Sequence, residues 1–123
     1  GTIDSIINPD TFNPRGRAPD GSLGWPVNDT RLMVLNSIKP YDSGDGLKNT
    51  EAWSCYDGSV FSANENDIIQ WDGQKWNVIF DSRNSSTSYV SNIKTGIQYM
   101  WNGSEWKKSF EGIYEALNWR LVL

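Results

Sequence analysis

A repeated aromatic motif constrains this chain more than any other feature. Residues 71–76 read WDGQKW, and residues 101–106 read WNGSEW, 30 residues further along the chain. The match continues to Phe80 and Phe110, and residues 56–61 (YDGSVF) form a shorter relative. The repeat is defined by an aromatic residue, a central glycine and a second aromatic residue, at Trp71, Gly73, Trp76, Trp101, Gly103 and Trp106.

The centre of each motif predicts a β-hairpin. Asp-Gly and Asn-Gly tolerate the positive φ angles that tight hairpin turns require. A two-residue turn would place Trp71 opposite Gln74, whereas a four-residue loop would place it opposite Trp76. Since side chains alternate along a strand, either turn puts one set of residues on one face. These are Ile69, Trp71, Trp76, Val78 and Phe80 in the first copy and Tyr99, Trp101, Trp106 and Phe110 in the second.

An isolated hairpin is marginally stable, so the two hairpins must pack on each other or on a further strand. Residues 31–38 (RLMVLNSI) have the apolar run of a buried strand, and residues 40–50 read as a loop. No segment shows a sustained helical period, although a short helical turn over 110–117 is compatible with the pattern. With 123 residues, one domain is expected. The sequence predicts an all-β, mainly antiparallel, Trp-rich sheet domain over residues 30–123.

Residues 1–29 are expected to form an irregular, Pro-rich arm. Pro9, Pro14, Pro19 and Pro26 interrupt this stretch, and proline removes a donor from a β-ladder. Two interpretations stay open. In the first, the segment is an extended arm that wraps the body of the domain or reaches a neighbouring subunit. In the second, it is a plain N-terminal loop on its own domain.

The residue types present argue against catalysis. The chain has no histidine, which removes the commonest general base and metal ligand. The single Cys55 has no histidine to activate it and is expected to be a small buried hydrophobe. Two acidic clusters, Asp42 with Asp45 and Glu65 with Asp67, lack the spacing of a calcium loop and are expected to be solvated turns. No catalytic residue, metal ligand or cofactor is therefore predicted.

Charge and hydropathy also bear on the partners. The formal net charge is −4, whereas a nucleic-acid-binding domain is expected to carry a basic patch. No apolar run is long enough to cross a bilayer. We therefore expect neither a nucleic-acid partner nor a membrane.

The seven Trp residues allow two interpretations. They form either the core of a small sheet domain or, where exposed, a platform for a sugar face or a partner protein. Trp25 in the arm and Trp119 near the end are the expected exposed rings, and Tyr41 is a third candidate for binding. Most of the others are expected in the core.

The stretch from Asp67 to Leu123 resembles modules in virion proteins of tailed bacteriophages of the T4-like kind. Residues 68–76 (IIQWDGQKW) and 95–106 (TGIQYMWNGSEW) carry the resemblance, and residues 118–123 (NWRLVL) read as a terminal strand closing such a module. The resemblance implies a structural role in a tail, neck or fibre-associated protein. It implies a location in the virion, assembled in the host cytoplasm, and contacts with other virion proteins or with a second copy.

The alternative function is that of a carbohydrate-binding module, because exposed Trp residues interleaved with Asn, Asp and Gln suit a polysaccharide ligand. That alternative predicts exposed, coplanar indole rings flanked by amide side chains.

Overall fold

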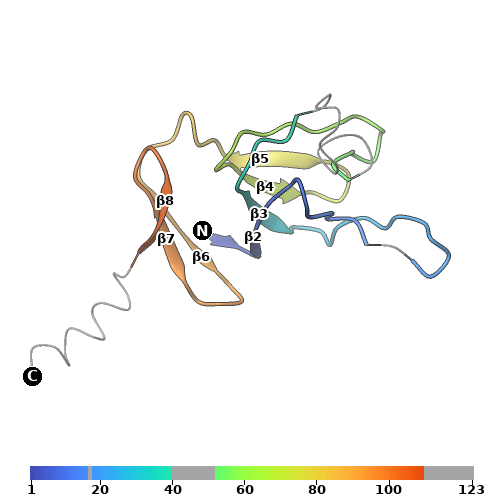
Figure 1. Ribbon diagram of the computed structural model, residues 1–123, viewed down its shortest axis with the longest axis horizontal. Helices are drawn as coiled ribbons and strands as arrows, with labels where there is room; N and C mark the ends of the chain where they lie inside the picture. Colours follow the sequence, from blue (N-terminus) through green and yellow to red (C-terminus); the bar gives the residue numbers. More distant parts are fainter. Residues whose placement is uncertain (17, 40–51, 110–123) are drawn as a thin grey trace, which may run out of the picture.

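The computed structural model describes residues 1–16, 18–39 and 52–109. These residues form an all-β, mostly antiparallel domain, as the sequence predicts (Figure 1). Eight strands are described: β1 (Thr2–Ile3), β2 (Ser5–Ile7), β3 (Arg31–Val34), β4 (Ile68–Trp71), β5 (Trp76–Phe80), β6 (Ser88–Asn92), β7 (Gln98–Trp101) and β8 (Trp106–Ser109).

The strands form two four-stranded sheets with the same plan. One has the order β2-β3-β4-β5 and the other has the order β1-β6-β7-β8. In each sheet a short first strand pairs in parallel, and the remaining three strands form an antiparallel meander. In Figure 1 the hairpin of β7 and β8 (orange to red) lies to the left of β4 and β5 (yellow-green to yellow).

The N-terminal residues correct one expectation. Residues 2–7, predicted to belong to an irregular arm, form β1 and β2 and pair with both sheets. Their apolar side chains explain this, because Ile3 and Ile7 are almost fully buried. The first proline comes only at residue 9, so no missing backbone donor interrupts these two strands. The described residues between Asn8 and Thr30 contain no further strand.

The predicted strand over residues 31–38 is shorter than expected. β3 ends at Val34, and Ile38 makes only an isolated bridge to Ala63. The predicted loop at 40–50, the helical turn over 110–117 and the terminal strand over 118–123 lie outside the described residues.

Both hairpins close through a four-residue loop, so Trp71 pairs directly with Trp76, and Trp101 with Trp106. In the first loop the Asp72 carboxylate oxygen Oδ1 accepts hydrogen bonds from the N–H groups of Gln74 and Lys75, both at 2.9 Å.

The second loop repeats this arrangement with a neutral side chain. Asn102 Oδ1 accepts from the N–H groups of Ser104 at 2.8 Å and Glu105 at 2.9 Å. The glycine of each loop adopts a positive φ, 103° at Gly73 and 98° at Gly103, where a side chain would be strained. The Asp-Gly and Asn-Gly dipeptides therefore act through an Asx turn followed by a left-handed glycine.

The likeness between the copies extends beyond the hairpins. Leu32 of β3 pairs with Ile69, and Val90 of β6 pairs with Tyr99 at the equivalent position. The parallel strands follow the same register, since Ile7 pairs with Val34, and Ile3 pairs with Asn92. The two sheets are therefore two versions of one four-stranded unit.

A β-bulge in β5 corrects a second expectation. Ile69 pairs with Val78 but Ile68 pairs with Phe80, so one additional residue, Ile79, lies between the two pairs. An additional residue reverses the side-chain alternation beyond it. Phe80 therefore does not share a face with Trp76, as the uninterrupted period predicts, and packs on the opposite side of the sheet.

Two apolar clusters cover the two faces of the β2-β3-β4-β5 sheet. The first cluster comprises Ile7, Leu32, Val34, Ile38, Ala52, Trp53, Ala63, Ile69, Trp71 and Trp76. The second lies between the sheets and comprises Ile3, Met33, Ile68 and Val90, with Ile6, Phe80, Tyr99 and Trp106 against it. The central strand β3 is therefore buried on both faces.

Candidate functional site

The aromatic residues expected to be exposed are only partly within the described chain. Trp25 is 39% exposed. Trp119 and Tyr41 lie outside the described residues. Trp25 stacks on the buried Trp71, with ring centroids 5.4 Å apart and an interplanar angle of 11°. It is thus the outermost ring of an aromatic stack that begins in the first cluster.

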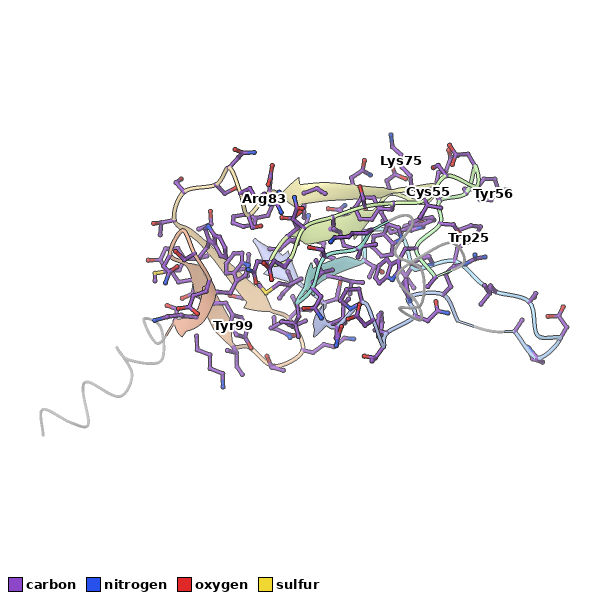
Figure 2. All side chains as sticks on the ribbon, turned by 45° about the horizontal axis from the view of Figure 1, so that its top comes forward. Trp25, Cys55, Tyr56, Lys75, Arg83 and Tyr99 are labelled. Carbon is purple, nitrogen blue, oxygen red and sulfur yellow. The ribbon has the colours of Figure 1, made fainter. Side chains whose placement is uncertain are left out.

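The sequence did not single out the neighbours of Trp25. The Tyr56 side chain is 65% exposed, and its ring centroid lies 5.6 Å from that of Trp25 at an angle of 45°. The Arg15 guanidinium carbon lies 3.9 Å from the centroid of the Trp25 ring, a cation–π distance. Figure 2 shows Trp25 and Tyr56 at the end of the molecule near Lys75. The shared spacing of the motifs at 56–61 and 71–76 was the available signal for Tyr56.

Most of the described Trp side chains belong to the core. Trp53, Trp71, Trp76 and Trp101 are each no more than 3% exposed. Trp53, which stands in no copy of the motif, donates its indole N–H to the carbonyl of Pro9 at 3.3 Å. This contact holds the N-terminal chain against the first cluster.

One acidic residue differs from its expected environment. Asp67, predicted to lie in a solvated turn with Glu65, is 1% exposed. Its Oδ1 accepts from the N–H and hydroxyl of Ser82 at 2.9 and 2.8 Å, and its Oδ2 accepts from the N–H of Asn64 at 3.0 Å. Asp67 therefore joins the loop before β4 to the loop after β5. Asp42 and Asp45 lie outside the described residues.

Cys55 is a free, buried cysteine. Within residues 1–16, 18–39 and 52–109, His, Cys, Asp and Glu form no group that could hold a metal ion. No helix in that part of the chain has the length and hydropathy to span a membrane.

The two sheets differ most at their hairpin edges. β5 and β8 are the edge strands that follow the two loops. β8 carries Lys107 and Lys108 after its first residue, as protected edges commonly do. At the equivalent positions β5 carries Asn77 and Val78, and the bulge residue Ile79 follows. Val78 is 39% exposed and Ile79 is 48% exposed, so β5 is an apolar edge without a protecting charge.

The backbone of β5 also has hydrogen-bonding groups that point away from β4. The N–H of Trp71 donates to the Thr30 carbonyl, and the Trp71 carbonyl accepts from Asp29. Antiparallel ladders alternate, so the residue opposite Trp71 directs its N–H and carbonyl away from β4. Trp76 is that residue, and Val78 follows it in the alternation. Neither residue has an outward backbone hydrogen bond to another described residue.

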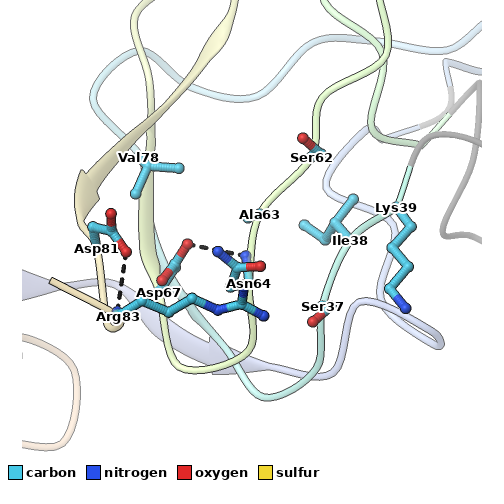
Figure 3. A pocket seen from close by; sticks show the side chains of 10 residues that line it. All are labelled: Ser37, Ile38, Lys39, Ser62, Ala63, Asn64, Asp67, Val78, Asp81 and Arg83. Carbon is cyan, nitrogen blue, oxygen red and sulfur yellow. Dashed lines mark hydrogen bonds between the residues drawn. The ribbon is translucent and has the colours of Figure 1, made fainter. Parts of the chain in front are cut away.

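A polar groove lies beside this edge (Figure 3). It has a volume of about 320 Å³. Val78, Asp81 and Arg83 line one side, coming from β5 and the chain that follows it. Residues 37–39 and 62–64 line the opposite side, where the bridge between Ile38 and Ala63 joins their chains. The lining comprises Ser37, Ile38, Lys39, Ser62, Ala63, Asn64, Asp67, Val78, Asp81 and Arg83.

The acidic groups of the groove are occupied by neighbouring donors. Asp67 accepts the three bonds given above. Asp81 accepts from the side-chain amide of Asn84 at 2.9 Å and from the N–H of Arg83 at 3.0 Å. These two bonds, with the Arg83 charge as a smaller cause, lower the pKa of Asp81 below its ordinary value.

The cationic groups of the groove are not occupied in this way. Lys39 and Arg83 are exposed, and neither side chain makes a hydrogen bond or ion pair with any described residue. The groove therefore presents unused cationic donors beside an apolar strand edge. Comparing the two copies could have revealed this edge, since lysines in one copy replace Asn77 and Val78 in the other.

Comparison with known proteins gives no further assignment. No protein-family model, curated protein or solved structure matches this chain.

Proposed function

We propose that this chain is a non-enzymatic assembly module of a phage virion and that it acts through protein–protein contacts made by β5. The observation that carries the proposal is the apolar edge of β5, where Val78 and Ile79 are exposed without a protecting charge. An exposed strand edge is a template for pairing with another chain, and most proteins protect such edges.

The difference between the two copies strengthens this argument. β8, built on the same register, carries Lys107 and Lys108 at its edge. Lysine on an edge strand opposes pairing because its charge would have to be desolvated. The edge without a charged residue is therefore specific to one copy and is not a property of the repeated unit. The likeness of the hairpin motifs to those of tailed-phage virion proteins supports a particle as the setting.

The test replaces the exposed apolar group by a charge. Ile79→Lys should weaken binding to a virion partner roughly tenfold or more, because the lysine would have to leave water in the contact. Binding is measured by calorimetry, with the proteins encoded by the neighbouring genes as the partners. Sedimentation of the chain alone tests a second copy as partner.

Ile93→Lys is the matched control. Ile93 is 59% exposed but lies in the turn between β6 and β7, so the same change there should leave binding intact. Equal binding by wild type and Ile79→Lys, with both folded, would exclude β5 as the contact.

A second candidate function rests on the exposed pair of Trp25 and Tyr56. Aromatic rings suit the apolar face of a sugar. The rings of Trp25 and Tyr56 are inclined at 45° to each other, so they do not form the flat platform that the sequence suggests.

A glycan array tests this function. The wild type should bind a polysaccharide, and Trp25→Ala and Tyr56→Ala should each abolish this binding. Tyr89→Ala is the control and should still bind, because the Tyr89 ring is 43% exposed but lies elsewhere on the surface. If the wild type binds none of the glycans, the carbohydrate function is ruled out.

A further inference from the structure

The groove and the edge of β5 form one continuous surface. Val78 belongs to both, since it is an exposed residue of the edge strand and also lines the groove. We propose that an extended segment of a partner protein adds to β5 as a strand and places an acidic side chain in the groove between Lys39 and Arg83. This inference rests on the proposed assembly function and specifies the chemistry of the partner.

The geometry of strand addition determines which partner residue enters the groove. A strand added to β5 would bond to the outward backbone groups of Val78, which lies in the exposed part of the strand. Residues directly opposite each other in adjacent strands project their side chains to the same face. The partner residue opposite Val78 would therefore project to the face on which the groove opens.

The unused groups of the groove determine the chemistry of that side chain. Asp67 and Asp81 already accept hydrogen bonds from donors of their own chain. Lys39 and Arg83 retain their donors among the described residues. A carboxylate is the acceptor that matches both cations, and arginine can bind it through two parallel bonds.

The same argument disfavours a second copy of this chain that pairs through β8. That edge would bring one of the consecutive Lys107 and Lys108, which project to opposite faces of β8, toward the surface that already carries Lys39 and Arg83. Like charges placed opposite each other in a ladder are destabilising. The occupant that fits is a strand of another protein with apolar residues and one acidic residue.

The experiment selects peptides from a random decapeptide display library on the folded chain. We expect enriched peptides to show alternating apolar and polar positions with a Glu or Asp at one of them. Dissociation constants are then measured by fluorescence anisotropy for a selected peptide, its Glu→Gln version and a version with N-methylated backbone amides. The Gln peptide should bind roughly 3- to 10-fold more weakly, as expected for a partly exposed ion pair.

Variants of the chain supply the matched controls. Arg83→Gln should weaken binding of the Glu peptide more than binding of the Gln peptide and so reduce the difference between their dissociation constants. Lys94→Gln removes an exposed lysine in the turn between β6 and β7 and should change neither. Backbone methylation should abolish binding, because it removes the main-chain donors of a strand.

The outcomes separate this inference from the function on which it rests. If selected peptides need Ile79 but show no preference for an acid and no response to Arg83→Gln, the acidic occupant is excluded and β5 remains the contact. A second outcome is that no peptide is enriched but the Ile79→Lys variant still binds an intact partner protein more weakly than wild type does. In that case strand addition is excluded, and assembly through β5 stands. If Ile79→Lys does not change the affinity for the intact partner protein, the proposed function itself fails.

Discussion

At the scale of single residues, Asp72 and Asn102 perform one task with different charges. Each side chain accepts two backbone N–H groups within its hairpin loop. Hydrogen bonds from Gln74 and then from Lys75 lower the pKa of Asp72, and the Asn77 amide adds to the effect. The first loop therefore depends on pH, whereas the second contains the neutral equivalent.

The sign of this dependence follows from the direction of the shift. A carboxyl whose folded pKa lies below its ordinary 3.8 stabilises the fold above that value and loses this contribution as pH falls through the folded pKa. Asp72→Asn keeps the acceptor oxygen but not the charge. We expect its Tm deficit relative to wild type to shrink between neutral pH and about pH 3. Thermal unfolding followed by circular dichroism measures this deficit, and parallel curves would contradict the assignment.

The reciprocal variant is the control for that experiment. Asn102→Asp places a carboxylate in the second loop and should make the protein more sensitive to acid than wild type. Asp20, Asp57 and Asp81 also have lowered pKa values, each through hydrogen bonds from residues shortly after it. The Asp72→Asn variant should therefore still lose some stability in acid.

Buried indole groups give a second prediction at this scale. Trp106 donates its N–H to the Asn66 carbonyl at 2.8 Å, whereas the buried N–H of Trp101 has no acceptor among the described residues. Leaving a buried donor unpaired costs about 1–3 kcal/mol. Trp106→Phe should therefore destabilise the fold by about 1 kcal/mol more than Trp101→Phe. Burial alone predicts the reverse order, because Trp101 is 2% exposed and Trp106 is only partly buried, and urea unfolding decides between them.

At the scale of elements, the bulge gives β5 two separate roles. Before the bulge, Trp76 packs in the first cluster, and Val78 lines the exposed groove. After it, the Phe80 ring lies 4.9 Å from the Trp106 ring and 5.7 Å from the Trp101 ring. One strand thereby forms an edge of its own sheet and a contact with the other sheet.

This division predicts unequal costs for neighbouring truncations. Phe80→Ala should lower the free energy of unfolding by about 3 kcal/mol, as expected when a packed aromatic ring is removed. Ile79→Ala should cost less than about 1 kcal/mol, because the Ile79 side chain is largely solvated. Urea denaturation of both variants tests this, and equal losses would show that the bulge does not direct Phe80 into the core.

At the scale of the whole molecule, residues 2–7 join the two sheets. β1 pairs with β6, and β2 pairs with β3, so one short segment belongs to both ladders. The second cluster has the same property, because Ile3 and Val90 come from one sheet, and Met33 and Ile68 come from the other. The sheets should therefore unfold as one cooperative unit.

Ile3→Ala tests this coupling. Ile3 is 1% exposed, and removing such a side chain costs about 2–5 kcal/mol. Native-state hydrogen exchange should show reduced protection in both β4 and β7, whereas Ile93→Ala, at an exposed position, should change neither. Loss of protection confined to the sheet of β1 would show that the sheets unfold independently.

The features that could be predicted from the sequence are those that depend on the chemistry of neighbouring residues. Asp-Gly and Asn-Gly specify hairpin turns through side-chain acceptors and positive φ, and the alternation of aromatic residues follows directly, so the all-β class and the aromatic core could be predicted. The exposure of Trp25 is expected because it lies in the Pro-rich segment, outside the repeated hairpins.

Tertiary structure decided features that depend on residues distant in the sequence. A bulge in β5 places Phe80 on the opposite face of the sheet. The buried Asp67 accepts a hydrogen bond from the distant Ser82. Residues 2–7 form strands because they pair in parallel with β6 and β3. The groove beside β5 requires residues 37–39 and the chain after β5 to line its opposite sides, although these segments are more than 40 residues apart in the sequence. Loop closure over such distances is governed by the packing of the whole core and leaves no local pattern in the sequence.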